Sequence, residues 1–152
     1  MDNTTKLIDF AEHFKQADGL LITAGAGMGV DSGLPDFRGD QGFWKAYPPL
    51  KHLGKSFVDM ATPELFYTDP KLAWGFYGLR LNAYRAVEPH QGFHLLKKWS
   101  ETLPNLKNGS FVFTSNVDGE FQKVGFENDQ VFECHGSIHW LQCLENCTQA
   151  IW

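Results

Sequence analysis

Three short apolar runs stand out along the chain, and polar residues follow each of them. The runs cover residues 20–24 (Leu-Leu-Ile-Thr-Ala), 110–114 (Ser-Phe-Val-Phe-Thr) and 131–134 (Val-Phe-Glu-Cys). Their length and their β-branched and aromatic content predict buried strands. Ligands of open α/β sheets bind beyond the carboxyl ends of the strands, so the polar residues after each run are candidates for a binding site.

Helical periodicity accounts for most of the remaining chain. Residues 4–17 carry apolar residues at spacings of three and four, and Asp18-Gly19 ends this predicted amphipathic helix. Residues 91–99 predict a second, shorter one. Between 42 and 99, aromatic residues recur at helix-compatible spacings among several prolines, which favours short helices. Aromatic residues in such a pattern more often pack a core than contact a ligand.

Composition restricts the class of protein. The chain has 152 residues, of which 43% are hydrophobic and 20% charged, as expected for one soluble domain. A net charge of -5 argues against a nucleic-acid-binding surface. No run of about 20 apolar residues could span a membrane, and residues 1–10 lack the positive region of a secretory signal. We therefore expect a cytoplasmic protein with neither nucleic acid nor membrane as a partner.

A glycine-rich stretch from Gly25 to Gly39 follows the first run directly. Glycines at such a point let backbone N–H groups approach a bound phosphate. The dinucleotide fingerprint G-x-G-x-x-G is incomplete because Val30 takes the place of the third glycine, and the Gly-Lys-Ser/Thr of a Walker A loop is absent. Gly25-Ala26-Gly27 alone would also fit an ordinary strand-to-helix turn. The aperiodic Asp36-Phe37-Arg38 after Pro35 is poorly explained by packing, which favours a nucleotide pocket.

The other two runs end in Ser115-Asn116-Val117-Asp118-Gly119 and in His135-Gly136-Ser137. A Ser-Asn-Asp cluster is also common in plain turns. A histidine at an arbitrary position is more often structural than catalytic. An imidazole has an ordinary pKa near 6.5, which suits a general base at neutral pH.

Together these motifs resemble those of the sirtuin family, the NAD-dependent protein deacylases. Ala24 to Gly39 aligns without a gap with the nucleotide loop of that family. Ser115-Asn116-Val117-Asp118 resembles the end of its Thr-Gln-Asn-Ile-Asp motif, with Ser115 in place of Gln, and Glu133 to Ser137 resembles Glu-x-His-Gly-Ser. Shorter matches occur in the helical region, at Gly42-Phe43-Trp44, Thr62-Pro63-Glu64-Leu65-Phe66 and Asp69-Pro70-Lys71-Leu72-Ala73-Trp74.

The resemblance implies an α/β fold with an incomplete Rossmann-like parallel sheet. Residues 1–41 and 100–137 would form the nucleotide-binding part, residues 42–99 a helical insertion, and residues 138–152 the start of a zinc-ribbon module. The cofactor would be NAD and the other partner an acylated lysine of a protein or peptide. The acyl oxygen would attack C1′ of the nicotinamide ribose, and the products would be nicotinamide, free lysine and O-acyl-ADP-ribose.

The resemblance also implies the site residues. His135 would be the general base, with Asn116 and Asp118 on the nicotinamide side of the pocket. Asp36, Phe37 and Arg38 would form a mobile loop that shields the reacting centre from water. The implied NAD-binding residues are Gly25, Ala26, Gly27, Met28, Asp36, Phe37, Arg38, Ser115, Asn116, Asp118 and His135.

The cysteines Cys134, Cys143 and Cys147 lie within the last 19 residues. An odd, clustered set in a chain without a signal peptide favours metal or redox chemistry over disulfides. One ion cannot bind residues 135, 139, 143 and 147 along a helix, because the outermost two would be ~18 Å apart. By resemblance, Cys143 and Cys147 begin a four-cysteine zinc site. The sequence holds no second pair, so it predicts half a zinc site.

Three functions remain open at this stage. The resemblance covers only about the first half of a sirtuin catalytic domain, so we expect a fragment whose sheet exposes an edge and apolar faces. Deacylation of protein lysines is the first interpretation. NAD hydrolysis or ADP-ribosyl transfer in the same pocket is the second, because Gly29, where the family commonly has Ser, and Ser115 leave room for it. The third is an inactive fragment that folds only with a partner.

Overall fold

A parallel sheet forms the centre of the fold. The structure is a computed structural model that describes residues 2–35 and 39–152. The sheet has three strands in the order β1 (Leu20–Ala24), β2 (Ser110–Thr114) and β3 (Val131–Glu133). Val112 pairs with Ile22 on one side and with Val131 on the other. The three predicted strands are therefore confirmed, although β3 ends at Glu133 rather than at Cys134.

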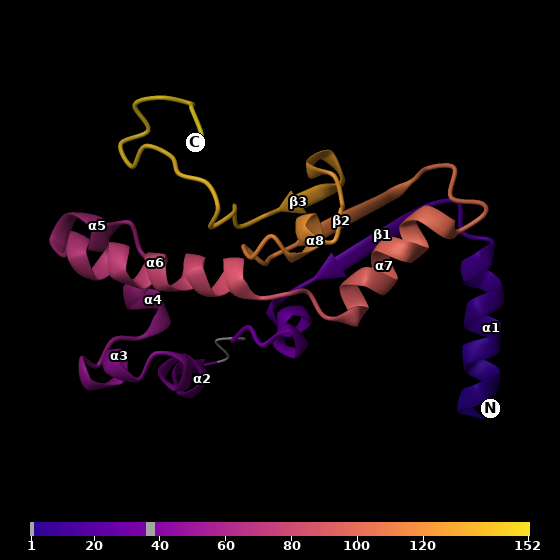
Figure 1. The fold of residues 1–152 in the computed structure, drawn as a ribbon, viewed down its shortest axis with the longest axis horizontal. Helices are drawn as coiled ribbons and strands as arrows, with labels where there is room; N and C mark the ends of the chain where they lie inside the picture. The colour runs from indigo at the N-terminus through magenta and orange to yellow at the C-terminus, as the bar shows by residue number, and fades with distance from the viewer. Residues whose placement is uncertain (1, 36–38) are drawn as a thin grey trace.

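Helices cover one face of this sheet. Strand β1 leads into a 3₁₀ helix, η1 (Ala26–Ser32), and α7 (Gln91–Thr102) precedes β2 along the chain. The other elements of this part are α1 (Asn3–Lys15), α8 (Glu120–Lys123) and η2 (Asn128–Gln130). Figure 1 shows α7 running along the sheet and α1 standing at one end of it. The helices expected over residues 4–17 and 91–99 are confirmed, with slightly different ends.

The sheet has one covered and one exposed face, because side chains alternate along each strand. Ile22 and Val112 point into a core with Phe93 of α7 and with Phe121 and Phe126. On the opposite face four apolar side chains are exposed in the described structure, namely Leu21, Phe111, Phe113 and Phe132. The rings of Phe113 and Phe132 lie 5.6 Å apart across neighbouring strands.

Short helices between η1 and α7 build a second core. They are α2 (Gly39–Ala46), α3 (Pro48–His52), α4 (Phe57–Met60), α5 (Glu64–Thr68) and the longer α6 (Pro70–Ala86). Their core contains Phe43, Leu50, Met60, Leu65, Ala73 and Phe76. Pro48 and Pro70 occupy first-turn positions, where the missing N–H has no cost, so these prolines begin helices rather than interrupt them. Asp69 caps α6 by accepting a hydrogen bond from Leu72 N at 3.0 Å.

The last residues form an extended loop. Residues 134–152, all of which the structure describes, contain no helix. The loop closes where Leu141 and Trp152 exchange backbone hydrogen bonds of 2.6 and 3.0 Å. Figure 1 shows this segment passing from the end of β3 toward α5 and α6. Among the described residues, no helix combines the length and apolar character needed to cross a membrane.

Candidate functional site

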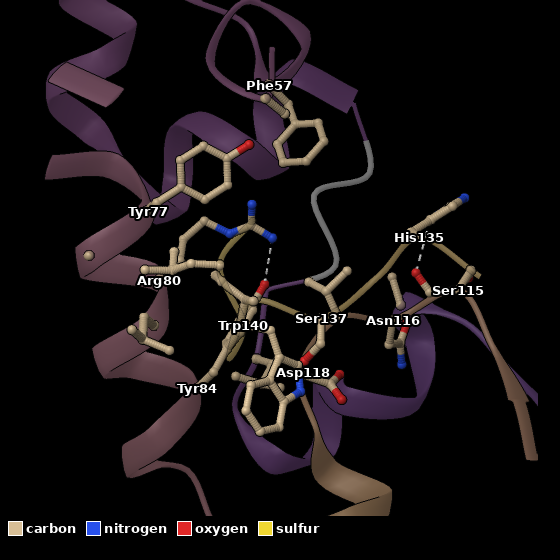
Figure 2. A pocket seen from close by; sticks show the side chains of 18 of the residues that line it. Phe57, Tyr77, Arg80, Tyr84, Ser115, Asn116, Asp118, His135, Ser137 and Trp140 are labelled. Carbon is tan, nitrogen blue, oxygen red and sulfur yellow. Dashed lines mark hydrogen bonds between the residues drawn. The ribbon is translucent and has the colours of Figure 1, made fainter. Parts of the chain in front are cut away.

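A large cavity lies between the strand ends of the sheet, the helical region α2 to α6, and the C-terminal loop of residues 134–152, called the closing loop below. Its volume is about 1050 Å³. One wall comes from the strand ends and η1, and Figure 2 shows Ser115, Asn116 and His135 on that side. Phe57, Tyr77 and Arg80 face them from the helical region. The closing loop contributes Ser137, Ile138, Trp140, Leu141, Gln142, Leu144 and Trp152.

His135 has a defined orientation in this wall. Its Nδ1 lies 3.1 Å from the backbone oxygen of Ser115. Because a carbonyl oxygen can only accept a hydrogen bond, Nδ1 donates its proton. In the neutral ring Nε2 is then unprotonated, which is the form that a general base requires. The ring is exposed, so a substrate can reach Nε2.

Asn116 connects the ends of the first two strands. Its side-chain Nδ2 donates to the backbone oxygen of Gly25 at 3.1 Å, and its backbone N–H donates to Thr114 Oγ1 at 3.1 Å. Ser115 N also donates to Ala24 O at 3.1 Å. The glycine-rich segment that begins at Gly25, called the glycine loop below, is therefore held against the segment of residues 115–119 by both backbone and side-chain hydrogen bonds.

Asp118 is a buried carboxyl group beside this connection. Only 7% of the residue is exposed, and Oδ1 accepts a hydrogen bond from Glu120 N at 3.1 Å. Burial raises the pKa of Asp118 above its ordinary value of 3.8. His139 Nε2 donates to the Asp118 backbone oxygen at 2.8 Å, which holds the closing loop against the motif. A Cβ at Gly29 would lie 3.1 Å from Leu34 Cδ1 and 3.7 Å from Asp118 Oδ2, so a larger residue there would crowd this corner.

A second buried acid lies behind Asp118. Glu120 is fully buried, and its Oε1 accepts a hydrogen bond from Lys123 Nζ at 3.0 Å. Burial raises the pKa of Glu120, and Lys123 acts in the opposite direction. The same ammonium group donates to the backbone oxygens of Tyr84 and Val87, at 2.5 Å each. Lys123 therefore joins α8 to the C-terminal end of α6, where a cation is favoured.

Some residues predicted for NAD binding lie away from the cavity or outside the described structure. Ala26, Ser115, Asn116, Asp118 and His135 line the cavity. The Met28 side chain packs against the core under the sheet. Gly25 is the N-cap of η1 and Gly27 lies within η1, and neither is among the residues that line the cavity. The predicted residues Asp36, Phe37 and Arg38 lie outside the described residues.

The predicted metal ligands Cys143 and Cys147 come together. Their sulfur atoms lie 2.7 Å apart in the closing loop. In the part of the chain that the structure describes, no group of three or more His, Cys, Asp or Glu side chains could hold a metal ion. Two thiols are half of the usual four-ligand set of a structural zinc site.

The sequence did not single out Arg80 as a residue of the helical wall of the cavity. Arg80 is only 6% exposed and donates from Nη2 to Tyr84 Oη at 2.9 Å. Its guanidinium carbon lies 5.3 to 6.0 Å from four aromatic ring centroids, those of Phe57, Phe76, Tyr77 and Tyr84. The spacing of Tyr77, Arg80 and Tyr84 at i, i+3 and i+7 places them on one helix face, and this was the available signal.

The fold is that of an α/β protein with a Rossmann-like parallel sheet, as predicted, and a cavity lies at the strand ends. The chain belongs to the Sir2 family, whose sequence model matches residues 25–151. Among curated relatives, the NAD-dependent protein deacylase of Candida albicans is 35% identical over 138 residues, or 91% of this chain and 42% of that protein. The mitochondrial NAD-dependent protein deacylase sirtuin-5 of Danio rerio is 32% identical over 141 residues, which are 93% of this chain and 43% of that protein.

Solved structures agree with this assignment. A Sir2 homologue in complex with NAD superimposes with a TM-score of 0.72 at 26% identity, covering 95% of this chain and 50% of that chain. A mutant Sir2 homologue in complex with 2′-O-acetyl ADP ribose gives a TM-score of 0.72 at 26% identity, and the match covers 100% of this chain and 53% of that chain. The chain therefore spans about half the length of the relatives and structures that it matches.

Asp118→Asn should stabilise the fold at neutral pH. A raised carboxyl pKa means that ionisation destabilises the folded state as the pH rises from about 3.8 through the folded-state pKa. Asn stays neutral and keeps an acceptor for Glu120 N. In urea unfolding, the variant should match the parent below pH 3.8 and exceed it at pH 7, whereas Asp129→Asn at an exposed position should show no such trend. A variant less stable than the parent at pH 7 would contradict this reading of the site.

Proposed function

We propose that the protein is an NAD-dependent protein-lysine deacylase that releases nicotinamide, O-acyl-ADP-ribose and free lysine. The observation that carries this proposal is the His135 ring, whose Nδ1 donates to Ser115 O and which lines the same cavity as Asn116 and Asp118. The names of the relatives, NAD-dependent protein deacylases, support the same reaction.

The residues divide the work between binding and proton transfer. The glycine loop and Ala26 would hold NAD, whose glycosidic carbon supplies the electrophile when it is bound. Asn116 is fixed by its bond to Gly25 O and can orient the ribose or a water molecule beside it. His135 Nε2 would accept a proton from a ribose hydroxyl after the acyl oxygen has attacked. The apolar side chains of the closing loop would keep bulk water from this centre.

His135→Ala should abolish deacylation while leaving NAD affinity within about tenfold. A general base lowers the reaction barrier by a factor of typically 10² to 10⁴ and contributes less to ground-state binding. Turnover of an acyl-lysine peptide and calorimetric NAD binding in the full chain would test this, with His52→Ala on α3 as an exposed control.

Two results would separate the alternatives. Near-full activity of His135→Ala would remove His135 from the catalytic role. Release of nicotinamide by the parent protein at the same rate with and without an acyl-lysine peptide would instead support NAD hydrolysis.

We further propose that the acyl group carries a carboxylate. The wall opposite His135 is mostly aromatic and also contains Arg80 of α6. The guanidinium group of Arg80 is positioned by its hydrogen bond to Tyr84 Oη. A guanidinium in a largely apolar cavity favours an anionic ligand, because a charge-assisted hydrogen bond is strongest away from water. A dicarboxylic acyl chain such as succinyl would place its carboxylate beside the guanidinium of Arg80, whereas a neutral acetyl group has no carboxylate to form this charge-assisted bond.

Arg80→Met should therefore change substrate preference rather than abolish activity. A hydrogen bond to a charged group contributes about 1.5 to 3 kcal/mol, which corresponds to a loss of about 10- to 100-fold in kcat/KM for a succinyl-lysine peptide. Activity on the acetyl-lysine peptide should change only a few fold and so report that the variant is folded. Arg85→Met, an exposed arginine on the same helix, is the matched control. An unchanged ratio of succinyl to acetyl activity would refute this acyl class.

We also propose a structural zinc ion at Cys143 and Cys147, with two further ligands that the described residues do not supply. The proximity of the two thiols supports this, because rotation of the side chains would widen their 2.7 Å separation to the ~3.8 Å that two Zn–S bonds of ~2.3 Å in a tetrahedral site require. Elemental analysis of the protein with all four ligands present should find zinc, and Cys143→Ser or Cys147→Ser should remove it and lower the unfolding temperature. Cys134→Ser should do neither, because Cys134 lies at the end of β3. A zinc-free parent with the same unfolding temperature as the serine variants would exclude the site.

A further inference from the structure

His90 lies outside the cavity lining but contacts two elements that build the site. It is the N-cap of α7, and its Nδ1 accepts a hydrogen bond from Gly92 N at 2.9 Å. Its Nε2 lies 2.8 Å from the backbone oxygen of Met28 in η1. Its backbone N–H donates to Ser32 Oγ, at the end of η1, at 3.0 Å. One residue therefore joins the start of α7 to two points of the glycine loop.

The two ring contacts fix the state of the imidazole. The Met28 carbonyl can only accept, so Nε2 donates, and Gly92 N–H can only donate, so Nδ1 carries no proton. The ring packs edge-on against Phe93, with centroids 4.9 Å apart. Phe93 is fully buried in the core under the sheet, so the imidazole packs directly against that core.

Gly92 provides the space that this ring occupies. A Cβ at position 92 would lie 2.5 Å from His90 Cε1 and 2.9 Å from Nδ1. Any side chain at that position would displace the imidazole from its place between the two elements. His90 and Gly92 therefore act as a pair, although neither lines the cavity.

The glycine loop needs support of this kind. η1 spans seven residues, and 3₁₀ helices longer than three or four residues are uncommon because their hydrogen bonds have poor geometry. Its last turn ends at Gly33 with a φ of 91°, where the chain reverses direction. External bonds to Met28 O and Ser32 Oγ hold such a segment in one shape.

We propose that His90 is a positioning residue that holds the glycine loop in its NAD-binding shape, an inference that rests on the proposed function. His90 touches the loop at Met28 and Ser32, on either side of Gly29 at the cavity, and it anchors both points to α7. Loss of the tether leaves the loop with more conformations, so that NAD binding must then fix them at a cost in affinity.

Two substitutions isolate the tether from the helix cap. His90→Asn keeps an accepting side-chain oxygen for Gly92 N, since Asn is a favoured N-cap, but its shorter side chain does not reach Met28 O. Gly92→Ala displaces the ring without changing His90 itself. His94→Asn, an exposed histidine on the same helix, is the matched control.

Hydrogen exchange and NAD affinity of the full chain test the inference together. In both variants, amides 26–32 should exchange faster without NAD, and Kd and KM for NAD should rise about 3- to 10-fold, the effect of one lost hydrogen bond. KM for the acyl-lysine peptide and the unfolding temperature of His90→Asn should stay near parent values. Unchanged exchange, or faster exchange with unchanged NAD affinity, would overturn the inference. A parent chain that fails to bind NAD would refute the proposed function, while the exchange result would still report whether His90 holds the loop.

Discussion

The pairing of β1 with β2 is the constraint on which the rest of the structure depends. Parallel register places Ala24 opposite Thr114, so two segments 90 positions apart in the chain end side by side. The backbone bond from Ser115 N to Ala24 O and the side-chain bond from Asn116 to Gly25 O continue the pairing beyond the strands. The strand pairing therefore brings the glycine loop and the polar residues after β2 to the same edge of the sheet, and the hydrogen bond from Asn116 to Gly25 O then joins them.

Most of the fold and part of the site could be predicted from sequence. The strands were evident because each is a compact apolar run, and the strand-end residues Asn116, Asp118 and His135 followed from the rule that parallel strands present their carboxyl ends together. Arg80 was missed because its role depends on how α6 is placed against the sheet, which is a tertiary property. Lys123 contributes to that placement, because its ammonium group donates to the carbonyls of Tyr84 and Val87 while paired with Glu120.

The histidines show the limit of reasoning by residue type. Two histidines, His90 and His94, lie at the start of α7, and His90 is the one that caps the helix. Both occur in one short segment, and only the backbone direction at the helix start decides which imidazole faces Gly92 N. The sequence also did not indicate that His139 binds the backbone oxygen of Asp118. From residue type alone, His139 was a possible metal ligand.

The exposed sheet face has a geometric consequence for the site. Phe113 and Phe132 lie on the open side of the sheet, two residues before Ser115 and three residues before His135, respectively. The parallel pairing of β2 with β3 fixes the spacing of these rings on the open face, and the same pairing fixes the spacing of the polar segments that follow the two strands.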